Sequence, residues 1–132
     1  MSISRRIFEL ALPVALAVLP PLACAQSILD FDGWMQKIDR RNQSVQRNLA
    51  SKDAKAASAD AQQIVDLYGS METYFTRRPQ SAEAVKLSKE GRDLATTIIR
   101  SLAANDFADA SKAALDIAHA CRACHLQYKP LS

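Results

Sequence analysis

Glycine is scarce in this chain of 132 residues: there are three, whereas alanine recurs throughout. Alanine stabilises an α-helix relative to most residues, and glycine destabilises it. No stretch shows the strict alternation of apolar and polar residues that a half-buried strand requires. The composition therefore predicts an all-α protein and excludes a fold built around a sheet.

The chain also lacks an excess of charge of one sign. It has 17 basic and 14 acidic residues, a formal net charge of +3, and no run of Lys and Arg longer than two. Proteins that bind nucleic acid or an anionic membrane usually carry a concentrated basic segment. We therefore expect neither as a partner. Internal repeats of about 20 to 50 residues are absent as well, which excludes a solenoid.

The N-terminus holds the longest apolar segment. Residues 1–6 include two arginines, residues 7–22 are mainly apolar but contain proline, and Ala23-Cys24-Ala25 follows. This segment is too short and too interrupted to span a membrane. It has the basic, apolar and small-residue regions of a secretory signal peptide. We expect a periplasmic protein that is cleaved after Ala25, with a single domain over residues 26–132 and no membrane anchor.

Cysteine is scarce as well, with three in all. Cys24 lies at the end of the predicted signal, where an exported protein can be lipidated. Pro21 stands where a lipoprotein signal prefers an aliphatic residue, so we expect Cys24 to be removed with the signal. A diacylated Cys24 at the mature N-terminus, seen by mass spectrometry, would contradict this expectation. Two cysteines then remain, Cys121 and Cys124.

These two cysteines belong to the motif Cys121-Arg122-Ala123-Cys124-His125, close to the C-terminus. Cys-x-x-Cys-His is the attachment signature of a c-type haem. Each thiol adds across one vinyl group, and the imidazole becomes the proximal iron ligand. On a helix, side chains three and four residues apart share one side, so both sulfurs and the imidazole can meet one flat macrocycle. The motif predicts one haem c per chain, with His125 as an axial ligand.

Two other chemistries use similar residues. A dithiol redox pair would fit the cysteine spacing, but it normally follows a strand and lies at a helix N-terminus, and no strand pattern is present. A zinc site would need further ligands, for which the sequence offers Cys24 and His119.

Four stretches repeat apolar residues at alternating intervals of three and four, which indicates amphipathic helices. We predict helices over residues 28–50, 53–76, 81–102 and 106–128, with Asp53 and Ser81 as N-caps. Short connections favour an antiparallel up-down-up-down four-helix bundle. The cysteines continue the apolar stripe of the last helix, so a covalent haem is predicted to project into the shared core. On the first helix the opposite face, predicted to be exposed, carries Lys37, Arg40, Arg41 and Arg47.

The signal peptide, the alanine-rich helices and the C-terminal haem motif together resemble the class II c-type cytochromes, the cytochrome c′ and cytochrome c-556 group. The resemblance spans the mature chain and is most specific over residues 121–129. There the family typically shows Cys-Lys-x-Cys-His-x-x-Tyr-Arg, and Tyr128 matches its tyrosine. Lys129 replaces the usual arginine, and the connection between the second and third helices is short.

The resemblance implies a site on both sides of the iron. A methionine from the first helix is the sixth ligand in cytochrome c-556, and Met35 stands at about that position. Trp34 and Tyr128 are expected to pack against the haem, whereas Met71 on the second helix is expected to be core packing.

The function expected from this resemblance is a periplasmic one-electron carrier with a haem ligated by His125 and Met35 and with redox proteins as partners. The apolar stripe of the first helix offers no distal histidine or acid for proton transfer, so an enzyme such as a peroxidase is not expected. The alternative is a five-coordinate cytochrome c′-like protein that binds NO or CO, with Met35 off the iron. A homodimer through the first two helices, frequent in this family, stays open.

Overall fold

The computed structural model describes residues 28–128 of the chain. They form four helices and, within this range, no strand: α1 (Ile28–Ala50), α2 (Ala54–Thr76), α3 (Ala82–Ala103) and α4 (Phe107–Tyr128). The prediction of an all-α chain with four helices is confirmed, and each predicted range agrees with the observed one to within one residue at either end. The agreement follows from the regular three/four spacing of the apolar residues.

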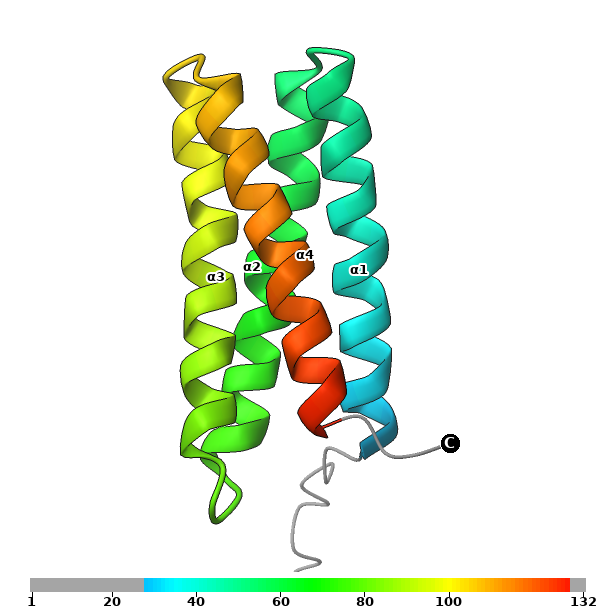
Figure 1. Ribbon diagram of the computed structural model, residues 1–132, viewed down its shortest axis with the longest axis vertical. Helices are drawn as coiled ribbons and strands as arrows, with labels where there is room; N and C mark the ends of the chain where they lie inside the picture. The colour runs from blue at the N-terminus through cyan, green and yellow to red at the C-terminus, as the bar shows by residue number, and fades with distance from the viewer. Residues whose placement is uncertain (1–27, 129–132) are drawn as a thin grey trace, which may run out of the picture.

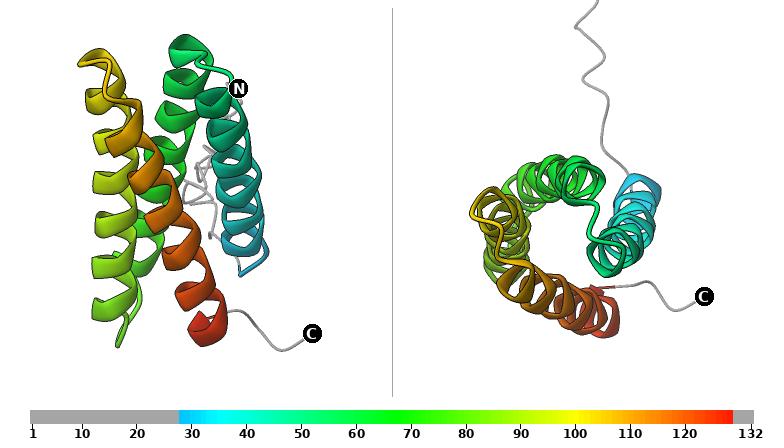
Figure 2. Two further views of the ribbon diagram at one scale, coloured as in Figure 1. Left: turned by 45° about the horizontal axis from the view of Figure 1, so that its top comes forward. Right: turned by 90° about the horizontal axis from the view of Figure 1, so that it is seen from above.

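The four helices lie side by side in a bundle (Figure 1). The α1–α2 and α3–α4 connections lie at one end of it and the α2–α3 connection at the other. Seen along its length, the bundle is a ring in which each helix packs on the next and α4 returns to α1 (Figure 2). The contact between α1 and α4 is the least extensive of the four. The end of α4 that carries the cysteines lies near the beginning of α1 (Figure 1).

The buried face of α1 shows how the sequence builds this core. Phe31, Met35, Ile38 and Val45 are almost fully buried, at the spacing predicted for one helix face. Asn42 takes the remaining step and is also buried, with its Nδ2 donating to the Ala114 carbonyl at 2.8 Å. This hydrogen bond joins α1 to α4, the neighbouring pair of helices with the least extensive contact.

The helix starts differ in how they are capped. Asp53 accepts a hydrogen bond from the Ala56 amide at 3.0 Å, which confirms the predicted N-cap of α2. Ser81 occupies the N-cap position of α3, but its hydroxyl makes no capping bond and lies 3.4 Å from the Pro79 carbonyl oxygen. The predicted side-chain cap at Ser81 is therefore wrong, because the hydroxyl faces the preceding turn instead of the helix.

The three connections are made without glycine. Each contains one residue in the left-handed region: Lys52, Gln80 and Asn105, with φ of 61°, 60° and 57°. A residue other than glycine has a cost of roughly 1–2 kcal/mol there. Backbone bonds across the turns offset part of this cost, among them Asp106 N to the Ser101 carbonyl at 2.8 Å.

The predicted signal peptide, its cleavage after Ala25 and Cys24 lie outside the described residues. Within residues 28–128, none of the helices combines the length and the apolar character that crossing a membrane requires.

Candidate haem-attachment site

The motif occupies the last turns of α4, and its cysteines face the core as predicted. Cys124 is buried, while Cys121 and His125 are half-buried. Both cysteines contact the hydrophobic core cluster, and both are free thiols, not joined in a disulfide. Two thiols and one imidazole are thus held three and four residues apart on one helix, at the spacing that haem attachment needs.

All four helices contribute side chains to one cavity in front of this motif. Its lining is mainly apolar, and its polar groups are the Tyr68 and Ser88 hydroxyls and the His125 ring. The lining residues are Met35 and Ile38 from α1, Tyr68 and Met71 from α2, Leu87 and Ser88 from α3, and Ala120, Cys121, Cys124 and His125 from α4.

The structure therefore brings Met35 together with the motif. It also brings Met71, which the sequence had assigned to core packing, to the same cavity. Both methionines are almost fully buried. If His125 held an iron, two thioether sulfurs, not one, would be present in the same cavity to supply a further ligand.

The donor set fits a haem in its chemistry. Two thiols can form thioethers, imidazole and thioether are the axial ligands of electron-carrying cytochromes, and the lining is apolar. The cavity itself measures about 20 Å³, room for little more than one water molecule. A macrocycle therefore requires the lining side chains and the end of α4 to move apart. The contact between α1 and α4 is the least extensive between neighbouring helices, so this pair holds the bundle together least.

Tyr68 is a site residue that the sequence did not single out. Its hydroxyl lies 3.8 Å from the Cys121 sulfur, close enough for a weak hydrogen bond. The ring is almost fully buried, and burial, followed by the neighbouring Cys121, raises the pKa of the phenol well above its usual value. Tyr68 therefore stays neutral and keeps a proton to donate inside the cavity.

The thiols themselves do not suit redox exchange. Burial raises the pKa of Cys121, and burial together with the charge of Cys121 raises the pKa of Cys124 to about 11. A dithiol redox pair needs the opposite, a thiolate stabilised at a helix N-terminus, whereas this pair lies at the C-terminal end of α4. The protonated, core-facing thiols therefore do not favour a dithiol redox role.

The surroundings of the two cysteines also lack further ligands for zinc within the described residues. Residues 28–128 contain no cluster of three or more His, Cys, Asp or Glu side chains that could hold a metal ion. His119 is exposed, and its Nδ1 lies 3.0 Å from Arg122 Nη2. It is therefore turned away from the cavity that both cysteines share.

Trp34 and Tyr128, predicted to pack against the haem, do not line the cavity. Both are half-buried in a neighbouring aromatic cluster. Trp34 meets Tyr74 edge-on at a centroid distance of 5.8 Å, and Tyr128 lies 5.6 Å from Phe75. Their contact with a haem stays a prediction, and the observed role of both rings is to join the ends of α1, α2 and α4.

Gly91 on α3 does not line the cavity but lies against Tyr68, which does. A Cβ atom at this position would collide with the Tyr68 ring, at carbons Cζ, Cε1 and Cε2. Gly91 therefore lets that ring lie directly against the α3 backbone. The contact of the ring with the backbone offsets the helix propensity that a glycine loses, about 1 kcal/mol relative to alanine.

A Gly91→Ala substitution is expected to destabilise the protein by about 1–2 kcal/mol, because overpacking outweighs the gain in helix propensity. Gly69→Ala on α2 is the matched control. Its added Cβ would meet nothing within 4 Å, so it should stabilise the protein by up to about 1 kcal/mol. Urea unfolding of both variants measures the difference. Equal effects of the two substitutions would show that Tyr68 does not depend on Gly91.

No family model matches the chain, and no solved structure matches it significantly. Its function is therefore inferred from its own residues and their arrangement.

Proposed function

We propose that this chain is an exported class II c-type cytochrome, a periplasmic one-electron carrier. In this proposal Cys121 and Cys124 hold one haem c through thioether bonds, His125 is its proximal ligand and Met35 its distal ligand. The four helices form an antiparallel up-down-up-down bundle around it, and residues 1–25 are the signal that exports the chain.

The observation that carries the proposal is the convergence of four groups on one apolar cavity. The two thiols, the His125 imidazole and the Met35 thioether line it together, although α1 and α4 are far apart in the sequence. The motif by itself predicts attachment and one ligand. Met35 adds a soft second ligand, which raises the reduction potential of a haem and resists displacement.

The residues around the cavity have roles that suit electron transfer. When bound, the haem iron supplies the chemistry by alternating between ferric and ferrous states as one electron enters and leaves. Ile38, Met71 and Leu87 present apolar surface that keeps water from the site and lowers the local dielectric. Ser88 Oγ donates to the Ala84 carbonyl at 2.8 Å, so the proton of this buried hydroxyl is satisfied within α3.

The proposal is tested on the full chain expressed with a c-type haem attachment system. After denaturation and extraction with acidic acetone, the purified protein should retain one haem per chain, and the reduced native protein should show sharp low-spin α and β bands. A chain that keeps its haem but gives a broad high-spin spectrum that shifts with carbon monoxide would instead be the five-coordinate, gas-binding form. Complete extraction of the haem would refute covalent attachment, and with it the assigned function.

A further inference from the structure

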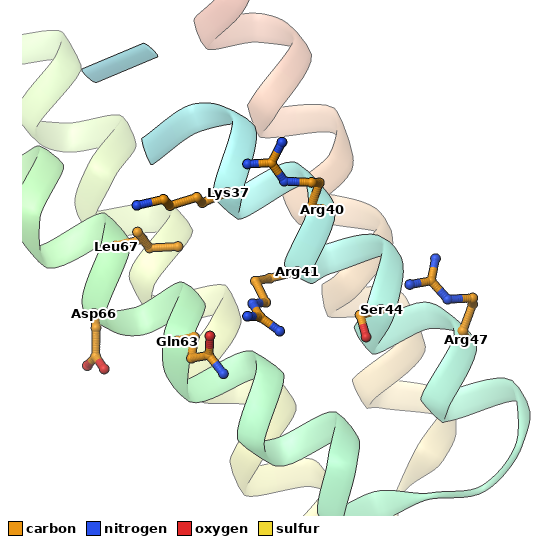
Figure 3. Close-up of a pocket in the computed structure, with 8 residues that line it drawn as sticks. All are labelled: Lys37, Arg40, Arg41, Ser44, Arg47, Gln63, Asp66 and Leu67. Atoms are coloured by element: carbon orange, nitrogen blue, oxygen red, sulfur yellow. The ribbon is translucent and has the colours of Figure 1, made fainter. Parts of the chain in front are cut away.

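The outer faces of α1 and α2 form an open groove that is dominated by positive charge (Figure 3). It has a volume of about 700 Å³. From α1 it is lined by Ser44 and by four cations at helical spacing, Lys37, Arg40, Arg41 and Arg47. From α2 it is lined by Gln63, Asp66 and Leu67. We call this surface the basic groove.

Most of this charge is uncompensated. Arg41 is paired, with its Nη1 at 3.1 Å from Oδ1 of the buried Asp60. The carboxylate of Asp66 points away from α1 (Figure 3). Three exposed cations have no ion pair within the part of the chain that the structure describes: Lys37, Arg40 and Arg47.

Two of the three aspartates of α1, Asp32 and Asp39, lie on a different stripe from the cations, whereas Asp30 lies seven residues before Lys37 on the same stripe. Asp32 and Asp39 are on the side of the helix away from α2, each bound to an amide four residues on. Gln36 Nε2 donates to Asp32 at 2.7 Å, and Gln43 Nε2 donates to Asp39 at 2.9 Å. From Asp32 onwards, the exposed surface of α1 is thus divided into a cationic side and a carboxylate–amide side.

The basic groove shares a wall with the cavity in front of the haem motif. Met35 and Tyr68 line the cavity, while Lys37 and Leu67, on the same turns of α1 and α2, line the groove. At this end the groove and the cavity share α1 and α2, and the far end of the groove, at Arg47, lies about 15 Å further along α1. A molecule seated in the groove would therefore be close to a redox centre in the cavity.

We propose that the basic groove docks the acidic surface of the protein with which the haem exchanges electrons. This inference rests on the proposed function and adds where the partner binds and what its surface must carry. Complementary charge steers two proteins into encounter and fixes their orientation. A second copy of this chain is a poor occupant, since pairing two such faces would bring like charges together. The groove also lacks aromatic side chains on which nucleic acid bases could stack.

The probe for the experiment is reduced flavodoxin, a small acidic protein whose flavin gives up one electron as the ferric haem gains one. The test variant is Lys37→Glu/Arg40→Glu/Arg47→Glu of the haem-loaded protein. Arg41 is left unchanged, because removing it would leave buried Asp60 without its ion pair. At an ionic strength of about 10 mM, the second-order rate constant should fall at least tenfold, and the difference should vanish near 1 M salt.

A control with the same change in net charge isolates the position of the groove from overall charge. Lys86, Arg100 and Lys112 are exposed cations on α3 and α4, and their triple change to glutamate should lower the rate by less than threefold. Equal losses in the two triple variants would overturn the proposal. Amide chemical shifts of the haem-loaded chain, recorded as oxidised flavodoxin is added, should change along residues 37–47 and 63–67. Changes confined to another surface would also overturn it.

Two further outcomes would assign the groove to a different occupant and so refute the docking proposal. One is a wild-type dimer, seen by sedimentation, that the groove variant dissociates. The other is salt-dependent binding to phosphatidylglycerol vesicles that only the groove variant loses. Failure of the proposed function is distinguishable, since it appears as absence of covalent haem. Unchanged electron-transfer rates in a haem-loaded variant refute docking alone.

Discussion

A Cys121→Ala/Cys124→Ala variant is expected to contain no covalently bound haem and to unfold well below the wild-type temperature. The thioether bonds need both sulfurs, and these are the free thiols that face the core from α4. Without the bonds a haem would have to bind from solution, whereas attachment gives it an effective concentration of about 1 mM or more. A group that binds only the folded state at 100 to 1,000 times its dissociation constant stabilises that state by about 3–4 kcal/mol.

For a domain of about 100 residues, a loss of 3 kcal/mol lowers the unfolding midpoint by roughly 12–24 °C. Circular dichroism during heating measures this, and a haem stain after denaturing electrophoresis reports attachment. Haem-free wild-type protein, produced in the cytoplasm from residues 26–132, is the control for the side-chain change itself and should unfold at nearly the same temperature as the variant. Wild-type thermal stability in the variant, or a retained haem stain, would contradict the prediction.

The fold could be predicted from the sequence because the spacing of apolar residues in each helix indicates which face is buried. On α1 the buried residues recur at the predicted steps, and Asn42 is buried at the step that the apolar pattern left empty. On α3 the agreement is looser. Ser88 and Ala95 are buried, whereas the more hydrophobic Leu87 and Leu94 beside them are only partly covered. Small residues at the buried positions let the neighbouring helices approach, and hydrophobicity alone does not report this.

The site was accessible only in part, because its other half depends on how the helices are rotated relative to one another. The motif places the two thiols and His125 on one side of α4, whichever helices lie opposite. Met71 and Tyr68 reach the same cavity only because of the orientation of α2, and the contact of Tyr68 with Gly91 depends in addition on α3. In the sequence, Tyr68 and Gly91 stand out as a tyrosine and a glycine within apolar helix stripes, but the sequence does not show that they contact each other. The basic groove likewise exists only once α1 and α2 lie side by side.

The second large effect is expected at Met35. Met35→Leu should convert a six-coordinate, low-spin haem into a five-coordinate, high-spin one that binds carbon monoxide, and should lower its reduction potential, because thioether ligation raises that potential. Leucine conserves the volume of this buried position, so the substitution removes the sulfur at a stability cost below about 1.5 kcal/mol. Absorption spectra of the reduced protein with and without carbon monoxide report the ligand directly.

Met71→Leu is the matched control, because Met71 is equally buried and lines the same cavity from α2. If Met35 is the ligand, Met71→Leu should keep the low-spin bands and resist carbon monoxide. The reverse pattern, with the spin state changed by Met71→Leu alone, would make Met71 the distal ligand and Met35 a packing residue. Low-spin bands that survive in the double variant would exclude both sulfurs. The two single substitutions therefore decide between two thioethers that the cavity wall presents together and that burial alone does not distinguish.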